Sequence, residues 1–348
     1  MPGRPVRILQ IAPPWFAVPP SGYGGIEWIV SSLADGLVAA GHDVTLHAAG
    51  DSRTTATLQS VFDVAPSLQI GNPWYEATHA VAGYADPGRF DVIHDHTGAI
   101  GPAIAAGITD RPPVVNTLHG CWTDANELLY RQISDRVELV GISDDQVART
   151  PEGIRVAGMV HNGIAMERYP FRADKEDFLL FVGRASADKG PEVAVEVARR
   201  LDMPLVMAIK VSDPLEVEYF ETIIAPAMRG ADVDVRTGVG HDEKVDLMGR
   251  ARAVLVPIRW DEPFGLVMAE ANACGTPVVA YRRGAAPEIL VDGSTGFLVE
   301  PGDLAAFTRA AGDVGQIDPV ACRARIEQEL SAERMVERYV ALYQRLVG

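Results

Sequence analysis

The sequence has 348 residues, 47% of them hydrophobic, so it is long enough for two globular domains and too apolar to be disordered. Its 31 basic and 47 acidic residues give a formal net charge of −16, which argues against nucleic-acid binding and against strong attraction to anionic lipid. Three cysteines without metal-type spacing argue against a disulfide framework or a zinc site. No apolar run reaches about 18 residues and no signal peptide is apparent, so we expect a cytoplasmic protein with at most peripheral membrane contact.

The first half alternates apolar, β-branched runs with amphipathic stretches, which predicts βαβ units and a parallel sheet. The expected strands are Val6–Ala12, Asp43–Ala49, Phe90–His94, Pro113–Leu118 and Glu138–Ile142, and the expected helices are Ile26–Ala40, Gly98–Ala106 and Glu127–Ile133. Ligands of such sheets bind at the carboxyl ends of the strands.

The second half repeats this alternation. The expected strands are Phe178–Val182, Pro204–Lys210, Val233–Thr237, Arg252–Ile258 and Thr276–Ala280, and the expected helices are Pro191–Arg200, Leu215–Met228, Asp242–Arg250 and Leu266–Ala273. Apolar residues recur at helical spacing near the C-terminus, from Met335 to Leu346, and we interpret this stripe as core.

A glycine-rich segment, Ser21–Gly25, follows the first expected strand and precedes a helix. Gly24 and Gly25 allow close backbone approach to an anion, and the helix directs its positive end there. A dinucleotide fingerprint would need glycine at position 27, where Glu27 stands. An NAD-dependent oxidoreductase is therefore a weaker hypothesis.

Histidines stand at two expected strand ends in the first half. His119 follows one apolar strand, and His94 and His96 share one face at the end of another. The spacing of His94 and His96 could hold a metal, but no third ligand is evident, so acceptor contact or strand termination is favoured. A structural role remains the alternative for His119.

Arg184 and Lys189 lie five residues apart, in a loop between an expected strand and an expected helix. A guanidinium, an ammonium and the backbone N–H groups of a helix N-terminus together favour an anion site. The Gly-Lys-Ser/Thr order of a P-loop is absent.

Two carboxylates, Glu262 and Glu270, stand eight residues apart, and Pro263 suits the first position of a helix. Eight helical steps give about 12 Å of rise and about 80° of rotation, so these groups would contact opposite ends of an elongated ligand. Between them, Phe264, Gly265 and Leu266 offer backbone N–H groups to a phosphate or a sugar oxygen.

Glu262-Pro263-Phe264-Gly265, Glu270-Ala271 and Gly275–Val279 together resemble the signature helix of the family 4 glycosyltransferases, the retaining group with the GT-B fold. The resemblance spans nearly the whole chain. It implies that Glu262 holds donor-sugar hydroxyls and that Glu270 holds ribose hydroxyls.

The same resemblance implies roles for the remaining candidates. Arg184 and Lys189 would hold the diphosphate, His119 would contact the donor sugar near the reacting bond, Gly24 and Gly25 would line the donor phosphate, and the backbone of Val239 and Gly240 would meet the nucleobase.

From this resemblance we expect two Rossmann-like domains with parallel sheets facing an interdomain cleft. Residues 1–164 would bind the acceptor and residues 165–330 the donor, with residues 331–348 returning to the first domain. The activity implied is retaining hexosyl transfer from a nucleoside-diphosphate sugar, a UDP-sugar being favoured, to a hydroxyl acceptor, with no cofactor and no catalytic metal. A noncatalytic sugar-nucleotide-binding protein and a GT-B UDP-sugar 2-epimerase are the alternatives. The sugar, the acceptor and the oligomeric state are left open.

Overall fold

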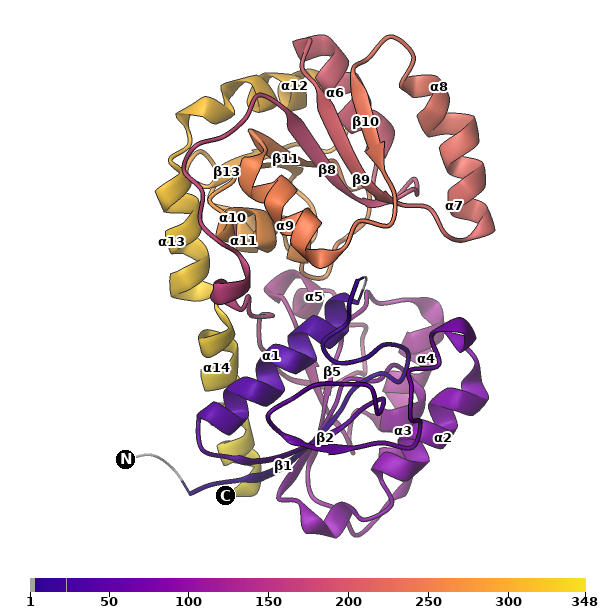
Figure 1. The fold of residues 1–348 in the computed structure, drawn as a ribbon. Coiled ribbons are helices and arrows are strands. Elements are labelled where there is room, and N and C mark those ends of the chain that lie inside the picture. The colour runs from indigo at the N-terminus through magenta and orange to yellow at the C-terminus, as the bar shows by residue number, and fades with distance from the viewer. Residues whose placement is uncertain (1–3, 23) are drawn as a thin grey trace. The chain divides into compact units, whose positions relative to one another are not determined.

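The computed structural model describes residues 4–22 and 24–348 (Figure 1). Tyr23, within the glycine-rich segment, lies outside the described residues. The chain divides into two compact units: Met1–Gly163 with Ala332–Gly348, and Ile164–Ser331. No described helix has both the length and the apolar character needed to cross a membrane.

The first unit is built on a parallel sheet with the strand order β3-β2-β1-β4-β5-β6-β7. Its strands are β1 (Arg7–Ile11), β2 (Asp43–His47), β3 (Thr57–Gln59), β4 (Val92–Asp95), β5 (Val114–Thr117), β6 (Glu138–Gly141) and β7 (Val156–Met159). Its α-helices are α1 (Gly25–Ala39), α2 (Pro73–Gly83), α3 (Ile100–Gly107), α4 (Asp124–Ile133), α5 (Asp144–Ala148) and α14 (Ala332–Val347).

The second unit is built on a parallel sheet with the strand order β10-β9-β8-β11-β12-β13. Its strands are β8 (Leu179–Arg184), β9 (Leu205–Lys210), β10 (Val233–Arg236), β11 (Ala253–Val256), β12 (Val278–Tyr281) and β13 (Gly296–Val299). Its α-helices are α6 (Pro191–Leu201), α7 (Pro214–Tyr219), α8 (Ala225–Ala227), α9 (His241–Arg250), α10 (Leu266–Ala273), α11 (Ala286–Ile289), α12 (Leu304–Asp313) and α13 (Pro319–Glu329).

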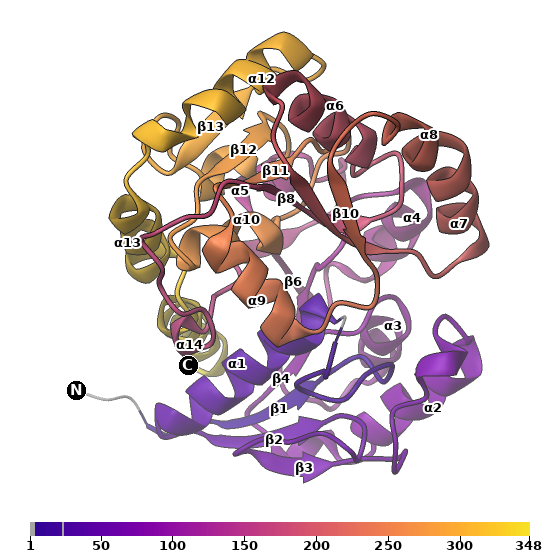
Figure 2. The ribbon, with the colours of Figure 1, turned by 45° about the horizontal axis from the view of Figure 1, so that its top comes forward.

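Both sheets reverse their strand order at one place. In the first unit β1 lies between β2 and β4, as Figure 2 shows, and in the second β8 lies between β9 and β11. The connections from β1 and β4, and from β8 and β11, therefore leave the sheet on opposite sides, which opens a crevice at the carboxyl ends of the paired strands. These two switch points are where ligands of such sheets bind.

The C-terminal helix α14 packs against α1 and completes the first unit (Figure 1). A Cβ atom added to Gly36 in α1 would lie 2.6 Å from Cγ2 of Val336, so glycine allows the two helices to approach closely. Met335, Val336, Tyr339 and Tyr343 are buried, which confirms the interpretation of this stripe as core.

Two features differ from the sequence prediction. The helix expected over 215–228 consists of α7, a π-helical turn at Phe220–Ile224 and α8. Pro226 has no backbone N–H and its ring would clash with the carbonyl four residues earlier, so the regular α-helical pattern gives way before it. The elements β3, α2, α5, β7 and α11 were not predicted, and each lies outside the strong apolar alternation.

Candidate active site

The switch point of the second unit brings two loops together. The loop after β8 ends at Gly190, and the loop after β11 begins at Pro257. The Arg259 N–H donates to the carbonyl oxygen of Asp188 at 2.7 Å. Gly190 has φ +64°, and a Cβ atom there would lie 2.5 Å from the Pro257 carbonyl oxygen, so only glycine fits this approach. The two loops are thereby joined through their backbones.

This junction places Lys189 against Glu262. Lys189 Nζ lies 2.5 Å from Glu262 Oε2, which also accepts a hydrogen bond from Trp260 Nε1 at 3.0 Å. The Lys189 ammonium lies 4.7 Å from the centre of the Trp260 ring, a cation–π distance. The side chains of Lys189 and Glu262 are 20% and 17% exposed, so the pair is shielded but reachable.

The backbone of Glu262 is held from its other side by Gly284. Gly284 has φ +56°, and a Cβ atom there would lie 2.4 Å from the Glu262 nitrogen. The Ala285 N–H donates to the Glu262 carbonyl oxygen at 2.9 Å. The carboxylate of Glu262 therefore projects from a fixed loop.

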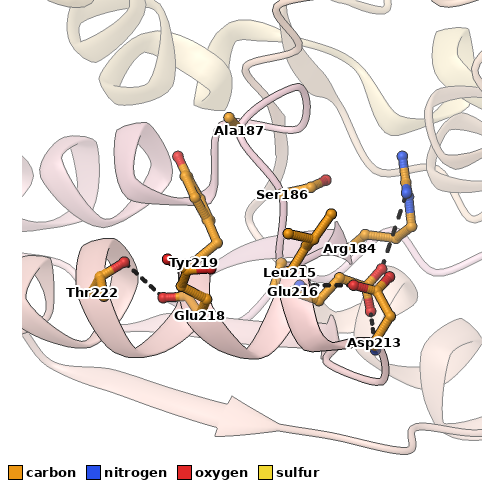
Figure 3. Close-up of a pocket in the computed structure, with 10 residues that line it drawn as sticks. Arg184, Ser186, Ala187, Asp213, Leu215, Glu216, Glu218, Tyr219 and Thr222 are labelled. Atoms are coloured by element: carbon orange, nitrogen blue, oxygen red, sulfur yellow. Dashed lines mark hydrogen bonds and ion pairs between the residues drawn. The ribbon is translucent and has the colours of Figure 1, made fainter.

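Arg184, expected beside Lys189, has different partners. Its guanidinium donates to Asp188 Oδ2 at 3.1 Å and lies 4.0 Å from Glu216 Oε1. It lines a cavity of about 380 Å³ together with Ser186, Tyr219 and other residues of α7 and the turn after it (Figure 3). Arg184, the last residue of β8, and Lys189, in the loop after it, thus pair with different carboxylates.

The helix after Glu262 has the bounds that the sequence predicted, Leu266–Ala273, but Pro263 does not take its first position. Helix α10 begins at Leu266, with Gly265 as its N-cap at φ +93°, and Pro263 lies in the preceding loop. The positive φ of Gly265 breaks the helical path that Pro263 would otherwise have started. The expectation of eight helical steps between Glu262 and Glu270 is therefore wrong, because only residues from 266 onward are helical.

Glu270 is buried in α10, with 5% exposed. Its carboxylate accepts hydrogen bonds from Lys244 Nζ at 2.7 and 2.8 Å and from the Tyr169 hydroxyl at 2.8 Å. Burial raises the pKa of Tyr169, and the charge of Glu270 raises it further. This buried carboxylate thus keeps a cationic partner and a neutral hydroxyl donor.

Sequence reasoning did not identify Lys244 or Tyr169. A signal was available for Lys244, because it is one of four lysines in the whole sequence and follows the turn at residues 237–240. Val239 lies in this turn, and Gly240 is the N-cap of α9, which carries Lys244. The proposed nucleobase turn and the Glu270 carboxylate are therefore linked through one helix.

In the first unit, His119 lies beyond β5 and contacts His96, which follows β4. His119 Nε2 and His96 Nδ1 are 3.0 Å apart, and burial lowers the pKa of His119 to about 4. The His94 and His96 rings lie 3.9 Å apart between centroids with their planes tilted by 36°, which confirms that they share one face. Across residues 4–22 and 24–348, no three His, Cys, Asp or Glu side chains are grouped so that they could hold a metal ion.

Gly24 is the N-cap of α1, with φ +148°. A Cβ atom there would lie 2.8 Å from Pro20 Cγ and 2.9 Å from Glu27 Oε2. Glu27 is 4% exposed, and burial raises its pKa to about 7. The turn at Gly24 and Gly25 thus packs directly on a buried carboxyl group, which the sequence prediction had used only to argue against a dinucleotide site.

Two family models match the chain. "Glycosyltransferase Family 4" matches residues 23–168, and "Glycosyl transferases group 1" matches residues 166–316. Together they span both units.

The chain is also similar to individual proteins over most of its length. It is 26% identical to a glycogen synthase of Mycobacterium tuberculosis strain H37Rv, covering 92% of this chain and 88% of the relative. It is 28% identical to a phosphatidyl-myo-inositol mannosyltransferase of Propionibacterium freudenreichii, covering 88% and 85%. Among solved structures, AviGT4, a glycosyltransferase involved in avilamycin A biosynthesis, superposes with a TM-score of 0.77 at 28% identity over 99% of this chain and 98% of that one.

Proposed function

Since the chain belongs to the family 4 glycosyltransferases and has the GT-B fold, we propose that it moves a sugar from a nucleoside-diphosphate sugar to a hydroxyl acceptor with retention of anomeric configuration. A UDP-sugar is the favoured donor, and no catalytic metal is required. The observation that carries the proposal is the contact of Lys189 with Glu262 at the switch point between β8 and β11.

Lys189 and Arg184 are assigned to the donor diphosphate. Cleavage of the bond between the sugar C1 and the diphosphate oxygen leaves negative charge on the diphosphate. Lys189 stands at the N-terminus of α6, where the helix dipole also favours an anion. Arg184 would exchange its contact with Asp188 for a phosphate oxygen, since exposed ion pairs of this kind contribute little on their own.

Glu262 is assigned to hydroxyls of the transferred sugar and Glu270 to hydroxyls of the ribose. Both are carboxylates with lone pairs beyond those their present partners occupy. Lys244 donates to both oxygens of Glu270 and so orients its carboxylate, and we assign Lys244 a positioning role. Val239 and Gly240 would meet the nucleobase through their backbone, and Phe264, Gly265 and Leu266 would offer N–H groups at the start of α10.

From the first unit, His119 is assigned to the donor sugar, and Gly24 and Gly25 to the donor phosphate. In the reaction the acceptor oxygen bonds to C1 on the face that the diphosphate leaves, and the hydroxyl proton passes to the departing phosphate oxygen. This route needs no covalent nucleophile. The names of the relatives involve inositol and glycogen, so inositol-containing and glucan acceptors are the first to test.

The test is a transfer assay with labelled nucleoside-diphosphate sugars, in which NMR reports the anomeric configuration of the product. Arg184→Ala and Glu262→Ala should each lower transfer by about tenfold or more, the scale of a lost electrostatic contact in the transition state. Arg236→Ala, which removes an exposed arginine paired with Asp234 and Glu243, is the control. Inverted product, an epimer formed without acceptor, or nucleotide binding without turnover of any donor would each reject the proposal.

A further inference from the structure

A chain of hydrogen bonds runs through the first unit and ends at His119. It joins side chains from β1, β4, β5 and α14, elements far apart in sequence. Its members, apart from the partly buried His119, are 0–2% exposed, and they are Gln10, His94, His96, Thr117, Tyr339 and Tyr343. The assignment of His119 to the donor sugar uses none of them.

The proton positions at the His119 end follow from the chemistry of an amide. His96 Nε2 lies 2.8 Å from Gln10 Oε1, and an amide oxygen only accepts, so His96 Nε2 carries the proton. Burial lowers the pKa of His96 well below its usual range, so its ring is neutral and Nδ1 only accepts. His119 Nε2, 3.0 Å from that Nδ1, must then be the donor. Nδ1 of His119 is left with a bare lone pair.

The other end of the chain agrees with this direction. Gln10 Nε2 donates to the Tyr343 hydroxyl at 3.2 Å, which in turn donates to His94 Nδ1 at 2.5 Å. His94 Nε2 then donates to Thr117 Oγ1 at 2.7 Å, and this hydroxyl has the Tyr339 hydroxyl 2.7 Å away as its own acceptor. Each donor therefore meets an acceptor, and all the hydrogen bonds from His119 to Tyr339 donate in the same direction along the chain.

Charged groups do not set this direction. Burial lowers the pKa values of His94, His96 and His119, and the further influence on His94 and His96 comes from neighbouring histidines. Asp95, between His94 and His96 in sequence, instead accepts a hydrogen bond from the Tyr84 hydroxyl at 2.7 Å. The orientation of the Gln10 amide is what fixes the protons.

We infer that Gln10, His96 and Tyr343 are positioning residues that hold the proton of His119 on Nε2 and present its Nδ1 as a hydrogen-bond acceptor to a sugar hydroxyl. This inference rests on the proposed role of His119. A bare nitrogen attracts an O–H group and repels a phosphate oxygen, which is also an acceptor. His119 therefore selects the hydroxyl-bearing part of the donor and not its diphosphate.

The direct test is a long-range ¹H–¹⁵N NMR correlation spectrum of the full chain, labelled with ¹⁵N-histidine and free of ligand. A His119→Asn spectrum assigns the His119 signals. At pH 7.5 we expect His119 to show a protonated Nε2 and an unprotonated Nδ1. A proton on His119 Nδ1 would overturn the inference. It would require every hydrogen bond between His119 and Tyr339 to run in the opposite direction, with the oxygen and nitrogen of the Gln10 amide exchanged.

A matched pair of variants separates this effect from general loosening of the core. His96→Leu removes the acceptor of His119, so both tautomers of His119 should appear, and kcat should fall about two- to tenfold, the effect of one hydrogen bond. His47→Leu removes another buried histidine of the same sheet, which bonds instead to the His79 carbonyl oxygen, and should keep the wild-type His119 signals. An unchanged His119 tautomer in His96→Leu contradicts the inference. If wild-type His119 shows the expected tautomer but the protein transfers no sugar, only the proposed function is contradicted.

Discussion

Lys189 Nζ and Glu262 Oε2 lie 2.5 Å apart although the two residues are 73 positions apart in sequence. The contact exists because β8 and β11 are neighbours in the sheet and their following loops are joined by the Arg259–Asp188 backbone hydrogen bond. Each group is the counter-charge of the other until a donor binds. A bound diphosphate would then share the Lys189 ammonium with Glu262. Binding of the phosphate by Lys189 would therefore be coupled to binding of the sugar hydroxyls by Glu262.

Substitution of two lysines of the second unit should have different effects, one on nucleotide binding and the other on stability. Lys244→Met leaves the buried carboxylate of Glu270 without its cation and should weaken nucleotide binding about tenfold or more, because the carboxylate is then free to reorient. Lys175→Met instead removes hydrogen bonds to the Gly249 carbonyl oxygen and Thr276 Oγ1. It should lower the melting temperature while folded protein binds nucleotide normally.

Calorimetric titration with nucleoside diphosphates and thermal unfolding of both variants provide the measurements. Equal nucleotide affinities for Lys244→Met and the wild type would rule out the positioning role of Lys244.

Acid should destabilise the first unit through its buried histidines. Burial lowers the pKa of His79 to about 3, from an unfolded value of about 6.5, while its Nε2 donates to the Ala12 carbonyl oxygen at 2.9 Å. The unfolded chain therefore binds the proton first, so the stability from neutral His79 is complete above about pH 6.5 and is lost as the pH falls toward 3. Between pH 6.5 and 5 the loss is about 2 kcal/mol.

Urea unfolding at pH 7.5, 6.5 and 5 measures this loss. His79→Gln keeps an N–H donor but cannot titrate, so its free energy of unfolding should fall less steeply over the same range. A slope equal to that of the wild type would show that His79 does not contribute.

The contribution of Glu27 to stability should depend on pH in the opposite direction. Its folded pKa of about 7 is above the unfolded value, so the folded chain binds the proton more tightly. Ionisation of Glu27 therefore lowers the free energy of unfolding, and this loss begins above pH 4.5 and is complete above pH 7. Glu27→Gln removes that loss. The variant should be more stable than the wild type by on the order of 2 kcal/mol at pH 8.5, with no gain at pH 4.5, when urea unfolding is compared at the two pH values.

Two helical glycines should respond in opposite ways to alanine. Gly36→Ala places a methyl group 2.6 Å from Val336 Cγ2, between α1 and α14, and should destabilise the chain by about 1–3 kcal/mol. In Gly312→Ala the new methyl lies 3.5 Å from Leu201 Cδ2, an ordinary contact, so the higher helix propensity of alanine should stabilise by up to about 1 kcal/mol. Equal effects on the urea midpoint would mean that the α1–α14 approach is not tight.

The sequence predicted the elements well where apolar periodicity was strong. The strand expected at Pro204–Lys210 is β9, Leu205–Lys210, and the helix expected at Pro191–Arg200 is α6, Pro191–Leu201. The helix expected at Leu266–Ala273 is α10 with the same bounds, but Pro263 lies in the loop before it and not at its first position, because Gly265 at positive φ is the N-cap. A local sequence pattern does not predict the role of such a residue when its backbone conformation depends on neighbouring loops.

The contacts of the candidate site were harder to predict than its residues. Lys189 and Glu262 were both selected, but their contact depends on strand order, which apolar alternation does not specify. Lys244 and Tyr169 were missed because neither belongs to a recognisable motif, and Glu270 gathers them only in three dimensions. The hydrogen-bond chain from Tyr343 to His119 joins residues more than 200 positions apart, beyond any local signal.

The most direct test of the account is a calorimetric titration of wild type, Lys189→Met and Glu262→Gln with UDP, GDP and ADP, with the matching nucleosides and with the sugar nucleotides. For the diphosphate that binds the wild type, we predict that Lys189→Met weakens binding about tenfold, with the nucleoside unaffected. Glu262→Gln should weaken only the sugar nucleotide. A Lys189→Met variant that binds the diphosphate as tightly as the wild type would contradict the assignment of this switch point as the donor site.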